Sequence, residues 1–436
     1  MTPQPDDAAM LESLQRAAVG YFLRHANPAN GLIADSSRDG APCSIAATGL
    51  GLAAYVVGAE RGYLPRRDAA VRTLTALRFF RDSPQGEQPD TTGHRGFYYH
   101  FLDMETGRRV WDCELSMIDT AILIGGVLTS GSYFSAPAAE EQEIRDLAKL
   151  LYERIDWPWA AVHGDVVRMG WKAGTGFLSY GWEGYSEAAL LYILGLGSPT
   201  HPLPAESYRA WTGTYQWENL YDIEYLFAGP LFIHQLSHIW IDFRGIQDPF
   251  MREKGFDYFE NSRRATAVQQ QYAIRNPNRF KGYDENCWGI TAGVGPGFST
   301  QRAEGGIERQ FFGYVTRGVP FGPDDGTLAP WVTAASLPFA PTLVLSALRH
   351  FREFYPECIN DHGLLTSFNP SFDVGEALGH GWISREHLGL DQGPVALMLE
   401  NYRSGLLWRL MRECPPIVTG LRRAGFADGW LRSKGR

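Results

Sequence analysis

The chain has 436 residues, of which 44% are hydrophobic and 20% charged, the balance of a globular protein with a sizeable core. Its net charge of −9 argues against nucleic acid and anionic membrane surfaces as partners, because both are bound through basic patches. The five cysteines form no CxxC pair, which indicates reduced thiols and not a disulfide framework.

The start of the chain has no basic stretch followed by an apolar run. The sequence as it stands therefore shows no secretory signal and indicates a cytoplasmic protein. No apolar stretch approaches the roughly 18 residues that cross a bilayer, so we expect no membrane insertion.

Apolar residues recur at three- and four-residue spacing over most of the chain, which predicts α-helices. Alternating patterns are rare and predict short strands only within residues 94–103 and 164–172. In chain order, the helices are expected within residues 8–26, 44–62, 69–83, 114–134, 139–157, 181–202, 220–243, 262–276, 334–354 and 393–411.

No Pro-, Ser- or Gly-rich linker divides the chain, so we expect a single domain over residues 1–436. Long loops rich in Gly, Pro and aromatic residues separate the helices, for example at 289–306, and loops of this length are usually functional. Paired helices with such loops favour an all-α fold, an (α/α) toroid with an inner and an outer ring of helices and a pocket at one end. Two helical domains are the alternative.

The stretch GWEGYSEAALLYILGLGSPTHP, which begins at Gly181, places Glu187 at the start of a predicted helix. On that helix Glu187 shares a face with three leucines, so its carboxyl should be buried and its pKa raised. A raised pKa is what a general acid needs near neutral pH. The alternative is a first-turn carboxylate at the positive end of the helix. Ser186 is interpreted as the helix N-cap, because no strand precedes it as in a nucleophile elbow.

Three further carboxylates could act with Glu187. Asp119 lies on the apolar stripe of the helix predicted within 114–134, so it must be paired, protonated or functional. A hydrogen bond to a neighbouring helix explains it equally well. Glu114 lies in the first turn of the same helix, and Asp391 precedes the helix within 393–411. For these two, helix-end stabilisation and N-capping are the alternatives.

His234, His238 and Asp242 follow one another at four-residue steps. On a helix the first and last would be about 12 Å apart, too far for one zinc ion with bonds of about 2 Å. We therefore expect no metal site. The histidines are expected to bind sugar hydroxyls or a catalytic carboxylate, with satisfied core histidines as the alternative.

The stretch KGYDENCWGITAGVGPG combines Glu285, Asn286 and Trp288 beside a Gly-rich loop. An acid and an amide can hold sugar hydroxyls, and an indole can cover a sugar ring. The alternative is an Asx-type cap. The loop lacks the G-K-[ST] of a phosphate-binding loop, so it does not indicate a nucleotide cofactor.

Seven stretches in order across about residues 95–412 together resemble the glycoamylase-like family, which includes bacterial endo-β-1,2-glucanases. They are GFYYHFLDMETG, ELSMIDTAIL, GWEGYSEAALLYILGLGSPTHP, FAGPLFIHQLSHIWIDFRGI, GYDENCWGITA, LPFAPTLVLSALRHF and LGLDQGPVALMLENYRSGLLW.

The resemblance implies an (α/α)6 toroid that hydrolyses β-glucan, with β-1,2-linkages as the best supported class. It also implies that Glu187 lies in the catalytic pocket with the acids of ELSMID near it. Members of this family are mostly exported, which implies a periplasmic protein if a signal has been removed.

The hypothesis for the chemistry is that Glu187 protonates the leaving oxygen and a second carboxylate activates water. The candidates for the second group are Asp119, Glu114 and Asp391, in that order, and inversion is the favoured outcome. No cofactor is required. Trp111, Trp182, Tyr185 and Trp288 are expected to stack on glucose rings, and His234, His238 and Arg244 to fix hydroxyls. A transglycosylase acting on the same glucan and a non-catalytic glucan-binding protein are the alternatives.

Overall fold

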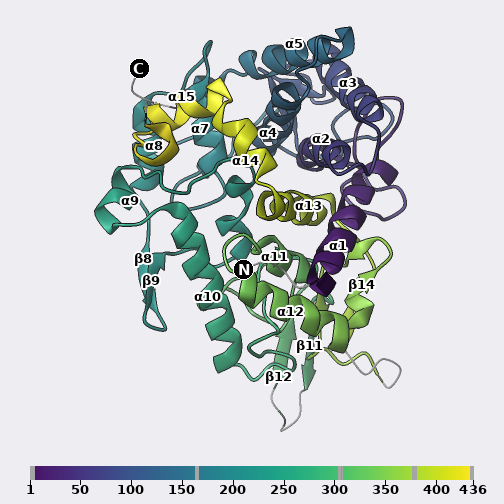
Figure 1. The fold of residues 1–436 in the computed structure, drawn as a ribbon, viewed down its shortest axis with the longest axis vertical. Helices are drawn as coiled ribbons and strands as arrows, with labels where there is room; N and C mark the ends of the chain where they lie inside the picture. The colour runs from purple at the N-terminus through teal and green to yellow at the C-terminus, as the bar shows by residue number, and fades with distance from the viewer. Residues whose placement is uncertain (1–4, 163–165, 303–305, 307, 376–380, 433–436) are drawn as a thin grey trace.

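The computed structural model describes residues 5–162, 166–302, 306, 308–375 and 381–432, and most of its regular structure is helical (Figure 1). The α-helices are α1 (Pro5–Arg24), α2 (Ile45–Glu60), α3 (Arg66–Asp82), α4 (Met117–Tyr133), α5 (Ala139–Glu153), α6 (Trp157–Ala160), α7 (Ala189–Gly197), α8 (Ala205–Thr212), α9 (Pro249–Lys254), α10 (Tyr258–Arg275), α11 (Pro330–Ala335), α12 (Pro341–Phe354), α13 (Gly389–Arg403), α14 (Leu406–Arg412) and α15 (Pro415–Arg423). The 3-10 helices are η2 (Leu231–His234), η3 (Leu236–Ile239), η5 (Pro356–Cys358) and η6 (Gly429–Leu431).

Helices α2, α4, α7, α11 and α13 are buried along nearly their whole length. A helix that is apolar on all sides must be enclosed by other elements. These five helices pack on one another in a series, α7 on α4, α4 on α2, α2 on α13 and α13 on α11. Amphipathic helices cover them from outside, with α3 on α2, α5 on α4, α1 on α2 and α13, α12 on α11, and α15 on α7.

The contact between α2 and α4 depends on glycine. A Cβ at Gly126 would lie 1.9 Å from the carbonyl oxygen of Gly49, and a Cβ at Gly49 would lie 2.4 Å from Cα of Leu123. The two backbones therefore approach more closely than any side chain permits. Part of the high glycine content thus serves packing between inner helices.

Segments far apart in the sequence close the fold. Helix α1, purple in Figure 1, lies beside α13 near the other end of the chain. The side-chain amide of Gln15 in α1 donates to the backbone oxygen of Ala396 and to the carboxylate of Glu400, both in α13. Within the described ranges, no helix is both long enough and apolar enough to cross a membrane.

The strands are short and form small antiparallel sheets. The largest sheet has five strands in the order β2-β3-β5-β6-β7. The strands are β1 (Cys43–Ser44), β2 (Gly93–His94), β3 (Phe97–Tyr99), β4 (Phe101–Leu102), β5 (Leu115–Ser116), β6 (Gly170–Lys172), β7 (Gly176–Phe177), β8 (Trp217–Leu220), β9 (Ile223–Leu226), β10 (Ala292–Gly293), β11 (Ser299–Arg302), β12 (Glu308–Phe311), β13 (Val315–Thr316), β14 (Ile359–Asn360), β15 (Gly363–Leu364), β16 (Phe368–Asn369) and β17 (Trp382–Ile383).

Strands predicted within 94–103 are confirmed, and the one predicted within 164–172 is confirmed at β6; residues 164 and 165 lie outside the described residues. The helix predicted within 220–243 is wrong. The hairpin β8–β9 begins this stretch, and Gly229 and Pro230 then lead into η2 and η3. Proline fixes φ and removes a backbone donor, which prevents one continuous helix. The helix predicted within 393–411 is divided at Gly405, which has φ 69°.

Candidate active site

Three titratable side chains meet where the five-stranded sheet leads into α4. His100 lies between β3 and β4, Glu114 directly precedes β5, and Asp119 lies in the first turn of α4. Pairing of Tyr99 with Leu115 brings the first two together, and Nδ1 of His100 lies 2.9 Å from Oε1 of Glu114. Its Nε2 lies 3.6 Å from Oδ2 of Asp119. One imidazole therefore faces two carboxylates.

The charge of His100 follows from these neighbours. Burial alone would lower its pKa, but the carboxylates of Asp119 and Glu114, with Asp35 nearby, outweigh burial and raise the pKa to about 9. The hydrogen bond from His100 in turn lowers the pKa of Glu114. Near neutral pH, His100 is therefore a cation and Glu114 an anion.

Asp119 is held within its own helix. Ser116 is the N-cap of α4, accepts a hydrogen bond from the Asp119 backbone N–H at 3.2 Å, and donates to Oδ2 of Asp119. This reciprocal arrangement resembles a capping box. The carboxyl is thus fixed in position, and the predicted alternative of a bond to a neighbouring helix is not the contact observed. The Asp119 residue is 8% exposed.

Glu187 lies in a turn two residues before α7, so the prediction that it shares a helix face with three leucines is wrong. The N-cap of α7 is Ala188, which has no side-chain cap, and Ser186 is therefore not the cap either. Ser237 at η3 replaces it, accepting from the N–H of Leu190 at 3.1 Å and donating to the carbonyl oxygen of Glu187 at 2.8 Å. A neighbouring element thus fixes the backbone at Glu187.

The surroundings of Glu187 match the predicted electrostatics although the helix position does not. Its side chain is partly buried. Burial raises the pKa of Glu187 to about 7, and the negative charge of Asp119 contributes in the same direction. Glu187 therefore carries a proton in a large fraction of molecules near neutral pH.

Two further carboxylates lie near this group. Asp35 precedes β1, and its carbonyl oxygen accepts from the N–H of Gly389 at the start of α13. Burial, with the charge of Asp119, raises the pKa of Asp35 to about 6. Asp391, in the first turn of α13, is 3% exposed, and burial raises its pKa well above the ordinary value. The prediction that Asp391 could be the N-cap of this helix is wrong, because Leu388 is the N-cap of α13.

Tyr314, between β12 and β13, brings these acids into one site. Burial of the hydroxyl raises its pKa to about 12, and the charges of Asp391, Asp35, Asp119 and Glu187 act in the same direction, so all four carboxylates lie within electrostatic reach of it. Tyr314 and Asp391 line the same pocket. The Tyr314 side chain is nevertheless 60% exposed, which indicates that it stands in an open cavity and not in packed core. We call the four carboxylates the acidic cluster.

Two pockets are lined in part by consecutive residues of η2, Phe232 in the first and Ile233 in the second. The first has an empty volume of about 460 Å³ and contains Asp391 and Tyr314. The second, here called the groove, has an empty volume of about 810 Å³. The first is also lined by Phe232, Gln235, Leu236, Ala292, Trp331, Leu388, Leu390 and Pro394; the groove is lined by Glu183, Gly184, Tyr185, Thr214, Gln216, Phe227, Ala228, Gly229 and Ile233.

Some aromatic residues predicted to bind sugar lie at this site. The side chain of Trp111 is 69% exposed, and its ring lies 5.1 Å from that of Phe101, which stacks on His100. Tyr185 lines the groove. Trp182 is partly buried, and its carbonyl oxygen accepts from Tyr192. Trp111 and Tyr185 are therefore placed to meet a ligand.

Other predicted binding residues are buried. His234 and His238 are buried among aromatic rings and bonded to Ala228 and Ser262, and burial lowers their pKa values to about 4 and 3. They are neutral, and their placement favours the alternative of core histidines. Trp288 is fully buried, so it cannot cover a sugar ring in this structure.

Arg244 also lies away from the acidic cluster. Its guanidinium pairs with Asp242 and lies over Trp408 in α14, beyond the C-terminal end of α13. Asp391 lies at the opposite end of α13, a helix about 22 Å long. Glu285 and Asn286 follow α10 in a surface turn in which Asp284 accepts from the N–H of Asn286, the predicted Asx alternative.

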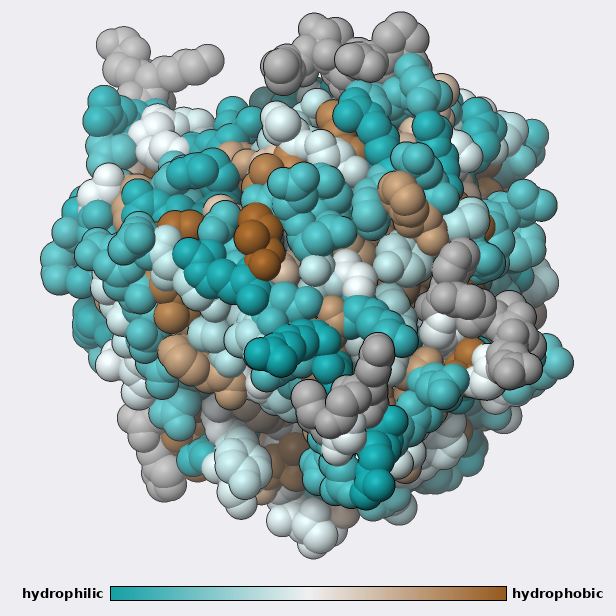
Figure 2. All heavy atoms as spheres, turned by 90° about the horizontal axis from the view of Figure 1, so that it is seen from below, coloured by the Kyte–Doolittle hydropathy of each residue, from teal (hydrophilic) through white to brown (hydrophobic). Residues whose placement is uncertain are grey.

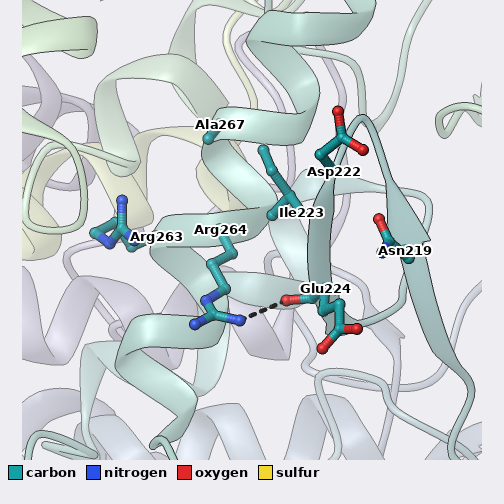
Figure 3. A pocket seen from close by; sticks show the side chains of 7 residues that line it. All are labelled: Asn219, Asp222, Ile223, Glu224, Arg263, Arg264 and Ala267. Atoms are coloured by element: carbon teal, nitrogen blue, oxygen red, sulfur yellow. Dashed lines mark hydrogen bonds between the residues drawn. The ribbon is translucent and has the colours of Figure 1, made fainter.

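A third pocket lies between the hairpin β8–β9 and α10 (Figure 3). It is lined mainly by charged and polar side chains, and Arg264 donates across it to the carbonyl oxygen of Glu224. The acidic cluster contributes no residue to it. Seen from below, the surface is mostly hydrophilic, with apolar residues scattered in small groups (Figure 2). Among the described residues, no group of three or more His, Cys, Asp or Glu is placed to hold a metal ion.

Sequence reasoning missed His100, Asp35 and Tyr314. His100 lies in a predicted strand segment, but that segment pairs with β5, which begins the stretch 114–134 that was predicted as helix, so the approach of His100 to Glu114 was missed. Asp35 and Tyr314 stand in irregular loops where no periodicity marks them. Their role depends on loops that converge from distant parts of the chain.

Comparisons with known proteins find relatives whose names refer to β-1,2-linked glucans. A curated relative from Parabacteroides distasonis, the exo beta-1,2-glucooligosaccharide sophorohydrolase (non-reducing end), is 27% identical and matches 96% of this chain. The chain spans 58% of the length of that relative. The solved endo-beta-1,2-glucanase of Chitinophaga pinensis, in complex with sophorotriose and glucose, is 25% identical with a TM-score of 0.85, covering 98% of this chain and 99% of that one.

A solved protein of Bacteroides uniformis, described as "a putative glucoamylase", is 28% identical to this chain with a TM-score of 0.86. The match covers 99% of this chain and 100% of that one. The model of the Glycoamylase family, described as "Putative glucoamylase", matches residues 179–415, more than half of the 436 residues. The matched range contains Glu187, Tyr314 and Asp391. The resemblance stated from the sequence is confirmed, and the chain belongs to the Glycoamylase family.

Proposed function

We propose that this chain is a glycoside hydrolase that cleaves β-glucan, with β-1,2-linked glucan as its substrate. The names of the relatives support the linkage, since the proteins of Parabacteroides distasonis and Chitinophaga pinensis both act on β-1,2-linked glucose units. Glu187 is the observation that carries the chemistry. Its pKa of about 7 leaves a proton on a substantial fraction of molecules near neutral pH, and a second carboxylate acts on it electrostatically. Glycoside hydrolysis requires such a pair of carboxyl groups.

In the proposed reaction, Glu187 donates its proton to the glycosidic oxygen as the bond from that oxygen to the anomeric carbon breaks. The second carboxylate takes a proton from water as the water oxygen bonds to the anomeric carbon. One water is consumed. At the end of the reaction Glu187 is ionised and the second carboxyl carries a proton. Attack on the face opposite the leaving group inverts the anomeric configuration.

Asp119 is the proposed second carboxylate. Its negative charge contributes to the raised pKa of Glu187, so it lies within electrostatic reach of the acid. Glu114 is occupied by its hydrogen bond to His100. The pKa of Asp391 is raised by burial, which favours its neutral form and makes it a poor acceptor of a proton from water. Trp111, Trp182 and Tyr185 are the proposed sugar-stacking residues.

For the architecture, we propose one (α/α)6 toroid. Its inner ring would consist of α2, α4, α7, the η2–η3 segment, α11 and α13. Besides the packing of the five helices, two sets of hydrogen bonds support the closure. Ser237 joins η3 to the start of α7, and Gln235 donates to Val332 in α11. A continuous core that runs from Met10 to Leu431 supports one domain.

The test is incubation with β-1,2-, β-1,3-, β-1,4- and α-1,4-glucans, with products separated by chromatography. We expect cleavage of β-1,2-glucan to short oligosaccharides, and Glu187→Gln to lower kcat by at least about 100-fold because the acid is lost. Glu206→Gln, an exposed glutamate on α8, serves as the matched control. Longer or cyclic products would contradict hydrolysis. Binding without cleavage by the unmutated protein would contradict an enzyme.

A further inference from the structure

Residues 312–325 form one segment, here called the arch, that carries two exposed aromatic side chains. Tyr314, near its start, lines the same pocket as Asp391 of the acidic cluster. Phe321, near its end, is 67% exposed. Its ring centroid lies 5.5 Å from that of Phe227, a groove residue, and the two rings meet edge to face at 62°. The arch therefore reaches from the reacting centre to a second position on the ligand-facing surface.

A buried ion pair holds the two ends of the arch together. The guanidinium of Arg317 donates to both carboxylate oxygens of Asp325, at 2.8 and 2.9 Å, and neither side chain is more than 1% exposed. Arg317 also donates to the carbonyl oxygens of Phe312 and Gly293, and Asp325 accepts from the N–H of Phe312. These bonds fix the arch as a rigid feature, so both aromatic residues are held in place.

The middle of the arch lies directly on the groove. The N–H of Val319 donates to the carbonyl oxygen of Gly229 at 3.2 Å, and a Cβ at Gly318 would lie 2.7 Å from the carbonyl carbon of Gly229. Gly229 itself lines the groove. This close backbone contact lies two residues before Phe321, whose ring meets the ring of Phe227 edge to face, and Phe227 lines the groove.

The groove lies close to the acidic cluster along the chain. Glu183, Gly184 and Tyr185 line it within four residues of Glu187. Phe232 lines the pocket of Asp391 and Tyr314, and the next residue, Ile233, lines the groove. Thr214 and Gln216 supply hydroxyl and amide groups to the same groove, and Phe227 supplies a ring. Polar groups for hydroxyls beside an aromatic face for C–H bonds are the complement of a pyranose ring.

We propose that Phe227 and Phe321 form a distal sugar platform that binds a glucose unit of the chain beyond the bond being cleaved. This proposal rests on the proposed function and extends it to chain length. A glucan long enough to pass from the acidic cluster into the groove gains the platform, and a disaccharide confined to the acidic cluster does not. The protein should therefore bind long glucans more tightly than the disaccharide.

The test is a binding measurement in the Glu187→Gln background, so that the glucan is not consumed. Calorimetry compares the affinities for a β-1,2-linked disaccharide and for long β-1,2-glucan. We expect Phe321→Ala to weaken binding of the long glucan about tenfold and to reduce the preference for long over short chains by the same factor. Phe354→Ala, which removes a 52% exposed phenylalanine from outer helix α12, is the matched control and should leave that preference unchanged.

The outcomes separate this inference from the proposed function. An unchanged preference in Phe321→Ala, or an equal loss for both ligands, overturns the platform even if the unmutated protein cleaves β-1,2-glucan. Length-dependent binding that is lost in Phe321→Ala supports the platform even if no cleavage is detected. Absence of binding to either ligand overturns both.

Discussion

At the scale of single residues, the chemistry depends on the environment of a carboxyl more than on its place in a helix. The pKa of Glu187 was predicted to be raised because the residue would lie on a buried helix face. The structure places it before the helix, yet burial in a turn raises the pKa to about 7 all the same. The sequence predicted a raised pKa for Glu187 because a carboxyl next to a strongly apolar segment is expected to be buried with it. It did not predict His100, whose charge comes from Glu114 just before β5 and Asp119 in α4.

The raised pKa of Glu187 predicts a pH-dependent gain in stability for Glu187→Gln. An acid whose pKa is about 7 in the folded state and 4.5 otherwise binds protons more tightly when folded, so it destabilises the folded protein increasingly as pH rises from 4.5 to 7. Glutamine cannot ionise. Glu187→Gln should therefore be more stable than the unmutated protein at pH 8, by up to about 3 kcal/mol, and equally stable near pH 4. Urea unfolding at both pH values measures the difference, and a gain of equal size at both would contradict a buried acid.

His100 is predicted to act by positioning the carboxylates. His100→Gln removes the positive charge that faces Glu114 and Asp119 at pH 6, well below the pKa of about 9 of His100. We expect kcat to fall about 10- to 100-fold with little change in KM, as for other groups that orient a reacting residue. His201→Gln, at an exposed histidine, is the control. A rise in KM without a fall in kcat would instead indicate that His100 binds substrate.

At the scale of elements, the start of one helix is completed by its neighbour. Helix α7 has no side-chain cap of its own, and Ser237 at η3 supplies the missing acceptor. The long helix predicted within 220–243 hid this arrangement, because apolar spacing is similar in a buried loop, a 3-10 turn and a helix. The long inner helices were predictable, since they are apolar throughout. Short elements set by tertiary contacts were not.

Ser237→Ala should therefore affect both stability and catalysis. The N–H of Leu190 loses its acceptor and the carbonyl of Glu187 its donor, which should cost about 1–2 kcal/mol of unfolding free energy and lower kcat. Ser186→Ala is the matched control, because the hydroxyl of Ser186 accepts a long hydrogen bond of 3.4 Å from Trp211 and does not cap α7. Urea unfolding and initial rates measure the two effects. Greater loss in Ser186→Ala would restore Ser186 as the cap.

At the scale of the whole molecule, the fold brings segments from both ends of the chain together, and the site is assembled in the same way. Asp35 comes from the first tenth of the chain, Asp391 from the last eighth, and the carbonyl oxygen of the first accepts from the N–H of Gly389 beside the second. Periodicity predicts each helix separately, but it does not say which helix ends meet. The family resemblance, and not periodicity, implied that Glu187 and the acids of ELSMID lie together, and their joint role in catalysis stays a prediction. Arg244 and Trp288, which were predicted to bind substrate, lie away from the acidic cluster and in the core, respectively.

Closure of the molecule is predicted to depend on Glu400. Its carboxylate in α13 has no exposure and accepts from Arg61 at the end of α2, at 2.7 and 2.9 Å, and from Gln15 in α1. Glu400→Ala leaves these donors without their partner, so the free energy of unfolding should fall by about 3–5 kcal/mol. The pair of Arg78 and Glu143 also joins two helices, but its side chains are 49% and 34% exposed, and Glu143→Ala should cost less than about 1 kcal/mol. Urea midpoints compare the two variants.

Because Glu400 lies about 14 Å along α13 from Asp391, kcat of the folded Glu400→Ala protein should be retained. Equal losses of stability in both variants would contradict the closing role of Glu400, and a loss of kcat without a loss of stability would place it in the chemistry instead.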